Sequence, residues 1–448
     1  MIPEEIIELA NYVNKLLQNE NAEDIVITAS RGASDEIKFV DNEIIKTTHG
    51  TGQGIDIFAN FGKKLVFTSL KDLTKDAART QVAKAIKFSK VLAPKKDWFG
   101  IANGPFRYKK ISDVFDKKIS NLNSSSQVDL VHKGVNASLA EGAKRSSGIF
   151  NMASAERYKV TSGGIEAEDA QTEAYFSIRA LVEKDASGHS TSTSAMLQKF
   201  DTEKAGEFAG QIAKQAIRPE KGKGGKYSVI FAPMAAAPLL ECAGNSLSMF
   251  DVESGTSFFT NKLGKQVANP LVKLTDDGTL PNGTGSALFD AEGVPTQKNI
   301  AIDKGILKTY LYNTSLAKKY KTKTTANAGI ISPHLHNIIL EGGKLSKEKL
   351  FSQVKNGLYI TNIWYTRFQN YTTGDFSTIP RDGIFIIKNG ELVKSVKQLR
   401  ISENMLNLLK NISGIANDVQ QITSWEVSTP TFTPHILIDN VNITEPTS

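Results

Sequence analysis

The chain has 448 residues, of which 40% are hydrophobic and 23% charged, a composition typical of a folded protein with two or three domains. Its 54 basic and 47 acidic residues are interleaved along the sequence, which argues against nucleic-acid binding, and no apolar run approaches the roughly 20 residues that cross a bilayer. A single cysteine excludes an intrachain disulfide and favours a reducing compartment, so we expect a cytoplasmic protein with no membrane association.

The first 93 residues predict an α+β domain in the order helix, β-meander, helix. Pro3 begins an amphipathic helix, because Ile6, Ala10, Val13 and Leu17 recur at helical spacing. Turn residues separate the strand-like runs that follow, and a second helix comes after them. These runs are at residues 24–28, 36–40, 43–48, 54–59 and 64–69, and the helix is at residues 74–91.

Residues 94–218 predict a connector followed by a middle α/β domain. Helices are expected near residues 128–145 and 202–218, and strands at residues 157–161 and 172–182. The composition of residues 184–193 (KDASGHSTST) is typical of a turn or mobile loop. Residues 219–226 (PEKGKGGK) lack apolar periodicity and predict a linker.

Residues 227–448 predict one larger, β-rich domain built on a curved antiparallel sheet. A strand at residues 227–231 leads into a helix that Pro233 begins and that ends near residue 245. Asp303-Lys304-Gly305 and Asn389-Gly390 each separate two strand-like runs, as the turns of hairpins do. The predicted fold class of the whole chain is therefore α+β.

Several sequence strings resemble the TldD/PmbA family. They follow the order and spacing of that family, and the N-terminal 93 residues are similar to its first domain. The strings are FTNKLGKQV at 259–267, DDGTLP at 276–281, DAEGVPTQ at 290–297, DKGILKTYL at 303–311, KTTANAG at 323–329, TGDFS at 373–377 and KNGELVKSV at 388–396.

The resemblance also implies a comparison of metal ligands. The catalytic subunit of a TldD/TldE pair carries HExxxH on the helix after an apolar strand, and a C-terminal cysteine completes its zinc site. In the matching stretch here, Glu241 replaces the first histidine, Cys242 the glutamate and Ser246 the second histidine. Serine is a poor zinc ligand, and the only cysteine of the chain lies inside the motif. The chain is therefore similar to TldE, the metal-free partner subunit, and zinc is expected in a TldD-like partner.

Other candidate residues have structural explanations. Cys242 lies among apolar residues, as buried packing cysteines do, and Glu241 fits a surface or interface position. His334 and His336 would face one side of a strand and could bind a metal, with Asp375 as a further carboxylate, but two imidazoles without an identified third ligand favour a loop or a partner-facing patch.

The leading hypothesis is a non-catalytic subunit of a cytoplasmic peptidase heterodimer that encloses unfolded peptides. The residues expected to line the shared chamber are Asn327, Ala328, Gly329, Thr373, Gly374, Asp375, Phe376 and Ser377. Two alternatives stay open at this point. One is a freestanding hydrolase with a relocated site at His334 and His336, and the other is a non-enzymatic, self-associating regulatory protein.

Overall fold

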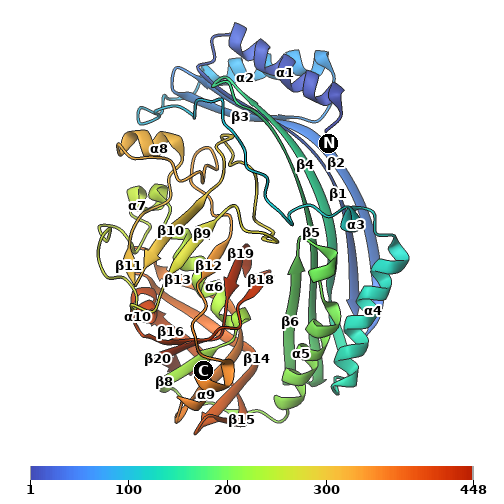
Figure 1. The fold of residues 1–448 in the computed structure, drawn as a ribbon, viewed down its shortest axis with the longest axis vertical. Coiled ribbons are helices and arrows are strands. Elements are labelled where there is room, and N and C mark those ends of the chain that lie inside the picture. The colour runs from blue at the N-terminus through green and yellow to red at the C-terminus, as the bar shows by residue number, and fades with distance from the viewer. Residues whose placement is uncertain (1, 446–448) are drawn as a thin grey trace.

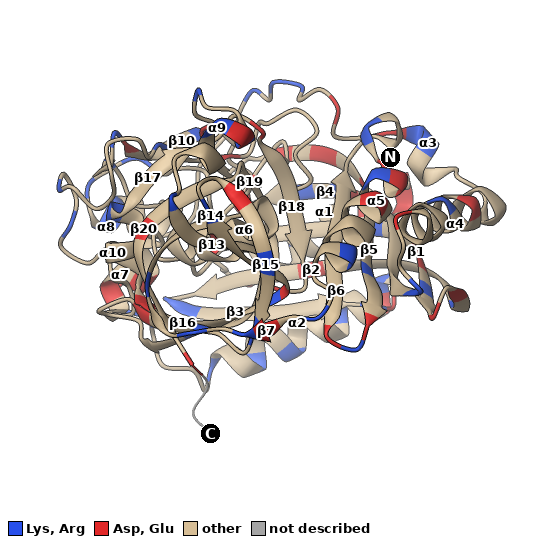
Figure 2. Ribbon diagram, turned by 90° about the horizontal axis from the view of Figure 1, so that it is seen from below, with Lys and Arg blue, Asp and Glu red and all other residues tan. Residues whose placement is uncertain are grey.

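A computed structural model describes residues 2–445 of the chain and confirms the α+β fold class. A long curved sheet forms one side of the molecule, and a β-rich body built from the second half of the chain lies against it (Figure 1). Basic and acidic segments are mixed over both parts (Figure 2). None of the described helices combines the length and apolar character needed to span a membrane.

The curved sheet has six antiparallel strands in the order β3-β2-β1-β4-β5-β6. Its ladders continue through polar and glycine-rich stretches, for example where Gly32 pairs with Gly52, so the short predicted runs join into long strands. The strands are β1 (Asp24–Val40), β2 (Glu43–Phe61), β3 (Lys64–Leu70), β4 (Arg145–Thr161), β5 (Glu166–Glu183) and β6 (Ala186–Ser194).

Helices cover the two ends of the curved sheet. The helices α1 (Glu4–Asn19) and α2 (Lys75–Ser89) bury Leu9, Val13 and Val82 against one end. At the other end, α4 (Ser124–Ala140) and α5 (Thr202–Gln215) enclose a second core around Phe176. The short α3 (Lys117–Ser120) precedes α4 in the chain, and the 3₁₀ turn Leu197–Lys199 precedes α5.

The C-terminal body contains two further sheets. One has the order β11-β10-β9-β12-β19-β18. In the other, β13 pairs with both β8 and β14. The five strands β13, β8, β20, β16 and β14 therefore form a closed ring. Outside the ring, β15 pairs with β14, β7 pairs with β15, and β17 pairs with β20. Most pairs are antiparallel, whereas β8–β13, β7–β15 and β12–β19 are parallel.

These sheets share one large apolar core, in which Phe231, Leu240, Ile360 and Ile438 are buried. The strands of the body are β7 (Glu220–Lys221), β8 (Gly225–Phe231), β9 (Leu274–Asp277), β10 (Lys298–Asp303), β11 (Ile306–Leu307), β12 (Ile338–Leu340), β13 (Asn356–Asn370), β14 (Asp375–Lys388), β15 (Glu391–Lys397), β16 (Arg400–Asn404), β17 (Ile412–Ile415), β18 (Gln420–Ser424), β19 (Val427–Thr433) and β20 (Ile436–Thr444). Its helices are α6 (Pro233–Asn245), α7 (Met249–Ser254), α8 (Thr314–Lys319), α9 (Lys347–Ser352) and α10 (Met405–Lys410).

Three local features differ from the sequence-based expectation. Residues 184–193 are the turn between β5 and β6 and most of β6, because β6 pairs with β5 and its small side chains, such as Gly188, pack closely against the helix α5. The predicted linker at residues 219–226 contains β7 and the start of β8. The strands of residues 1–93 and those of residues 94–218 share one sheet, whereas the sequence analysis placed them in two separate domains.

Candidate functional site

The helix α6 follows β8 directly, with Pro233 in its first turn, as the sequence predicted. Almost all of its side chains are buried, and it packs against β13 and β19. Glu241, which is 7% exposed, accepts hydrogen bonds from the Ser428 hydroxyl at 2.8 Å and from the Thr429 backbone N–H at 2.6 Å. Its carboxylate therefore ties α6 to β19.

Cys242 and Ser246 are engaged within the same helix region. Burial raises the pKa of the Cys242 thiol to about 12, and the negative charges of Glu241 and Glu426 act in the same direction. The Ser246 hydroxyl donates to the Cys242 carbonyl oxygen at 3.0 Å. A thiol with so high a pKa stays protonated and is neither a good nucleophile nor a ready metal ligand.

The predicted chamber residues Asn327, Ala328 and Gly329 lie in a buried polar network. The Asn327 amide donates to the Asp276 carboxylate at 2.7 Å and to the His334 carbonyl oxygen at 2.8 Å. The Ala328 N–H donates to the Asp290 carboxylate at 3.0 Å. The Gly329 Cα approaches the His334 ring so closely that a Cβ would overlap it. These residues hold loops together beside β9.

His334 and His336 lie in an irregular segment and not in a strand. His334 is exposed, whereas the His336 ring nitrogen Nε2 lies 3.0 Å from the Ala326 carbonyl oxygen and is therefore a donor. The His336 N–H donates to Asp276 at 2.7 Å. Within residues 2–445, no three His, Cys, Asp or Glu side chains are grouped so that they could hold a metal ion.

The second predicted group, residues 373–377, forms the turn before β14 and its first residues. Asp375 accepts hydrogen bonds from Asn404 at 2.8 Å and from the Thr373 hydroxyl at 2.5 Å, and these bonds lower its pKa. Phe376 and Ser377 are buried, whereas Thr373 and Asp375 are exposed. The two predicted groups share no hydrogen bond with each other among the described residues.

A buried charge cluster gives no local signal in the sequence, because its members are far apart in the chain. Lys159 of β4 donates to the Ala291 carbonyl oxygen at 3.0 Å, next to the buried Asp290 and Glu292. Burial raises the pKa of Glu292 to about 8, with Asp290 contributing, and lowers the pKa of Lys159 to about 8. The cluster joins the curved sheet to the C-terminal body.

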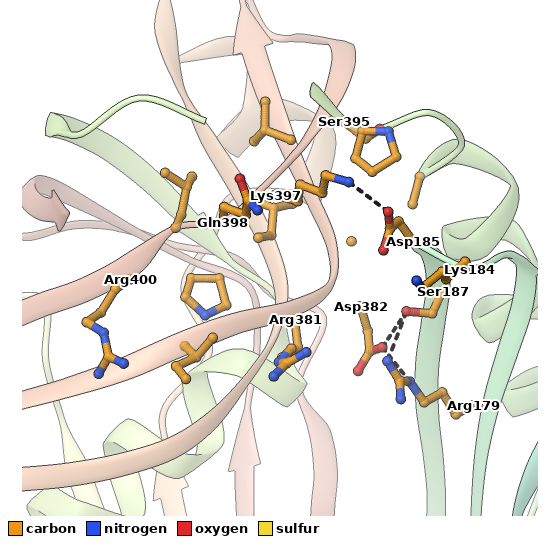
Figure 3. A pocket seen from close by; sticks show the side chains of 18 residues that line it. Arg179, Lys184, Asp185, Ser187, Arg381, Asp382, Ser395, Lys397, Gln398 and Arg400 are labelled. Atoms are coloured by element: carbon orange, nitrogen blue, oxygen red, sulfur yellow. Dashed lines mark hydrogen bonds and ion pairs between the residues drawn. The ribbon is translucent and has the colours of Figure 1, made fainter. Parts of the chain in front are cut away.

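A pocket of about 500 Å³ lies between the curved sheet and the C-terminal body (Figure 3). Its lining comes from the tip of the β5–β6 hairpin, from the middle of β14 and from the segment that joins β15 to β16. Five cationic side chains and two carboxylates line it. They are Arg179, Lys184, Arg381, Lys397 and Arg400, with Asp185 and Asp382.

Residues 224–445 match the family model described as the PmbA/TldA metallopeptidase C-terminal domain. Residues 224–445 belong to the TldD/PmbA family. It is 29% identical over 273 residues to a metalloprotease TldD homolog of Buchnera aphidicola, an alignment that spans 56% of each chain. It is 23% identical to a metalloprotease PmbA homolog of Haemophilus influenzae, covering 94% of this chain and 91% of that protein.

The fold is also similar to the crystal structure of TldE from Thermococcus kodakarensis, with a TM-score of 0.88 and 21% sequence identity. The likeness covers 97% of this chain and 100% of that one. At this level of identity the comparison shows a common fold, and the chemistry of this chain must be argued from its own side chains.

A metallopeptidase domain implies a metal ion, so the donors on α6 can be tested against the needs of zinc. Catalytic zinc takes about three ligands from histidine, thiolate and carboxylate side chains. The Glu241 carboxylate is already hydrogen-bonded to β19, the Cys242 thiol is held protonated, and the Ser246 hydroxyl donates to a helix carbonyl group. The α6 side chains therefore do not fit a catalytic zinc site.

Proposed function

We propose that this chain is the non-catalytic subunit of a TldD/TldE-type peptidase pair and that zinc is held by its TldD-like partner. The proposal rests on one observation above the others. The side chains on α6 are those of a closed, hydrogen-bonded helix, although the surrounding fold is that of the family. Hydrolysis must then be supplied by another polypeptide.

In this proposal the chain contributes a wall of the chamber that encloses unfolded peptides. Extended peptides are commonly held by backbone hydrogen bonds to a sheet edge, and the C-terminal body is rich in strands. The exposed Thr373 and Asp375 remain the best placed of the predicted chamber residues, because Asn327 is 1% exposed and its amide is committed to Asp276 and His334.

Co-expression tests this proposal. The tagged chain is produced with and without the paralogue of the same genome that retains HExxxH, and each preparation is analysed by size exclusion, zinc content and cleavage of a dye-labelled unfolded casein. We expect the pair to elute as one complex, to contain zinc and to lose activity with a chelator, whereas the isolated chain has neither zinc nor activity.

Two results would contradict the proposal. Stoichiometric zinc and chelator-sensitive cleavage in the isolated chain, both lost in a His334→Ala, His336→Ala double variant, would establish a relocated metal site. A stable self-dimer that never associates with the paralogue would identify a regulatory protein without a peptidase partner.

A further inference from the structure

The cationic pocket lies where a sheet is locally open. The strand β14 pairs with β16 through residues 375–378 and with β15 through residues 385–388. Between these stretches, residues 379–384 have no strand partner on that edge among the described residues, although the other edge pairs with β13. Residues 379–384 line the pocket. The pocket therefore borders a short stretch of β14 that no other described strand covers on this side. Pro380 lacks an N–H, and the Asp382 and Gly383 carbonyl oxygens accept from a threonine hydroxyl, that of Thr361, so only the remaining backbone groups are open to an added chain.

The charge in the pocket is unbalanced. Arg179 is paired with Asp382 at 2.7 Å and Lys397 with Asp185 at 2.7 Å. Neither Arg381 nor Arg400 has an ion pair with a carboxylate of residues 2–445. Arg400 instead donates to the Ser377 hydroxyl at 3.1 Å. Two guanidinium groups are thus left to bind an anion, and such groups suit carboxylates.

Aromatic side chains adjoin the pocket. The guanidinium groups of Arg179 and Arg381 lie over the Trp364 ring at 4.9 and 5.2 Å, and Trp364 packs edge-on against the exposed Trp425 at 5.3 Å. Stacking on the ring holds Arg381 in place, so less side-chain entropy is lost when it binds a ligand. Trp425 precedes β19 by two residues, and β19 holds the Glu241 carboxylate of α6.

We infer that this pocket binds a carboxylate of an extended peptide, held by Arg381 and Arg400 beside the open edge of β14. The inference rests on the proposed function, because it names the class of peptide that the chamber would favour. A carboxylate neutralises the unpaired guanidinium groups, an extended backbone can lie along the uncovered stretch of β14, and 500 Å³ holds a few peptide residues.

The test uses the isolated chain and synthetic peptides, so it does not depend on the partner subunit. Three dye-labelled octapeptides of threonine and valine are compared by fluorescence anisotropy. The first carries two glutamates and a C-terminal amide, the second carries glutamines in their place, and the third is the glutamine peptide with a free C-terminal carboxylate. We expect the glutamate peptide to bind at least about tenfold more tightly than the amidated glutamine peptide, and 300 mM salt to reduce this preference.

The third peptide identifies the source of the carboxylate. Tight binding of the glutamine peptide with a free terminus indicates recognition of a chain end, whereas tight binding of the glutamate peptide alone indicates recognition of a side chain. In the Arg381→Gln, Arg400→Gln double variant, we expect the preference to fall below about threefold. The control variant Arg107→Gln, Lys388→Gln loses two exposed charges away from the pocket and is expected to keep the preference.

Equal dissociation constants for all three peptides, or no binding of any of them, would overturn the inference. An equal loss in the control variant would do so too, because the effect would then be one of net charge. If the double variant misfolds, the effect of salt on the peptide preference of the unmodified chain still tests the inference, because a preference based on charge must weaken in 300 mM salt. Failure here together with zinc-dependent cleavage by the pair would leave the proposed function standing.

Discussion

Glu241 illustrates how a single side chain can determine what a helix does. A carboxylate on α6 could in principle ligate a metal, but both bonds recorded for this one come from β19. A buried carboxylate needs such partners, because an ionised group without hydrogen bonds is costly to remove from water. The position therefore joins two elements of the body by hydrogen bonds from the protein alone.

Replacing Glu241 by alanine should destabilise the fold. The Ser428 hydroxyl and the Thr429 N–H would lose their acceptor, and a buried unsatisfied donor costs about 1–3 kcal/mol. Glu241→Gln keeps one acceptor oxygen and should cost less. Urea unfolding followed by circular dichroism measures both changes, with the exposed Glu43→Ala as control. A Glu241→Ala variant as stable as the control would show that this link contributes nothing.

The Cys242 thiol should be unreactive in the folded protein. Burial, with Glu241 and Glu426 nearby, raises its pKa to about 12, so the thiolate is a very small fraction at pH 8. We expect iodoacetamide to label the native chain at least about 100-fold more slowly than the chain unfolded in guanidinium, as followed by mass spectrometry. Native labelling as fast as that of the unfolded chain would indicate an activated thiol.

At the scale of elements, the sequence predicted those helices and turns whose structure depends on a few neighbouring residues. The helix α1, the β8–α6 junction and the Asn389-Gly390 hairpin are all present, because apolar spacing, Pro233 and left-handed turn residues act over a few positions. The strand β6 was predicted as a loop. Its polar composition gives no strand signal, and burial against α5 and β14 decides its structure.

The site was less predictable than the fold for the same reason. Glu241, Cys242 and Ser246, which replace the family's metal-site residues, lie within six positions of the sequence, so a motif comparison could find them. The cationic pocket takes Arg179 from β5 and Arg381 from β14, which the sequence separates by about 200 positions. The Lys159 cluster has the same character. These groups come together only where the curved sheet packs against the C-terminal body.

The packing of α4 on α5 depends on two glycines that touch. A Cβ placed on Gly206 would lie 2.0 Å from the Gly134 carbonyl oxygen and 3.1 Å from the Gly134 Cα. Gly206→Ala must therefore push the helices apart, and we expect a loss of about 3 kcal/mol or more, at the upper end of overpacking effects. Thermal unfolding of this variant is compared with Gly52→Ala, where no atom lies within 4 Å. Equal stability of the two variants would mean that α4 and α5 pack more loosely.

At the scale of the whole molecule, the polar contacts that join the curved sheet to the body include two with buried charged groups. One is the Arg179–Asp382 pair, in which the buried Asp382 carboxylate also accepts a hydrogen bond from Ser187 at 2.7 Å. The other is the cluster of Lys159, Asp290 and Glu292. Buried charge at a junction is stable only when it is neutralised or paired, so the second contact should depend on pH.

The raised pKa of Glu292 determines whether stability rises or falls with pH. Burial raises its pKa to about 8 in the folded chain, against about 4.3 when unfolded. Between these values the folded chain holds the extra proton, so stability falls as pH rises, by up to about 1.4 kcal/mol per pH unit. Below the unfolded pKa and above the folded one, Glu292 adds no further slope.

Glu292→Gln should remove this pH dependence, because glutamine resembles the protonated side chain in shape and cannot ionise. We expect the variant and the unmodified chain to be similarly stable at pH 5.0, and the variant to be more stable at pH 8.0 by up to about 4 kcal/mol. Urea midpoints at both pH values measure the difference, and the exposed Glu391→Gln serves as control. Parallel pH profiles for the two proteins would mean that Glu292 is ionised in the fold, with Lys159 as its charged partner, since a paired carboxylate loses no stability as pH rises to neutrality.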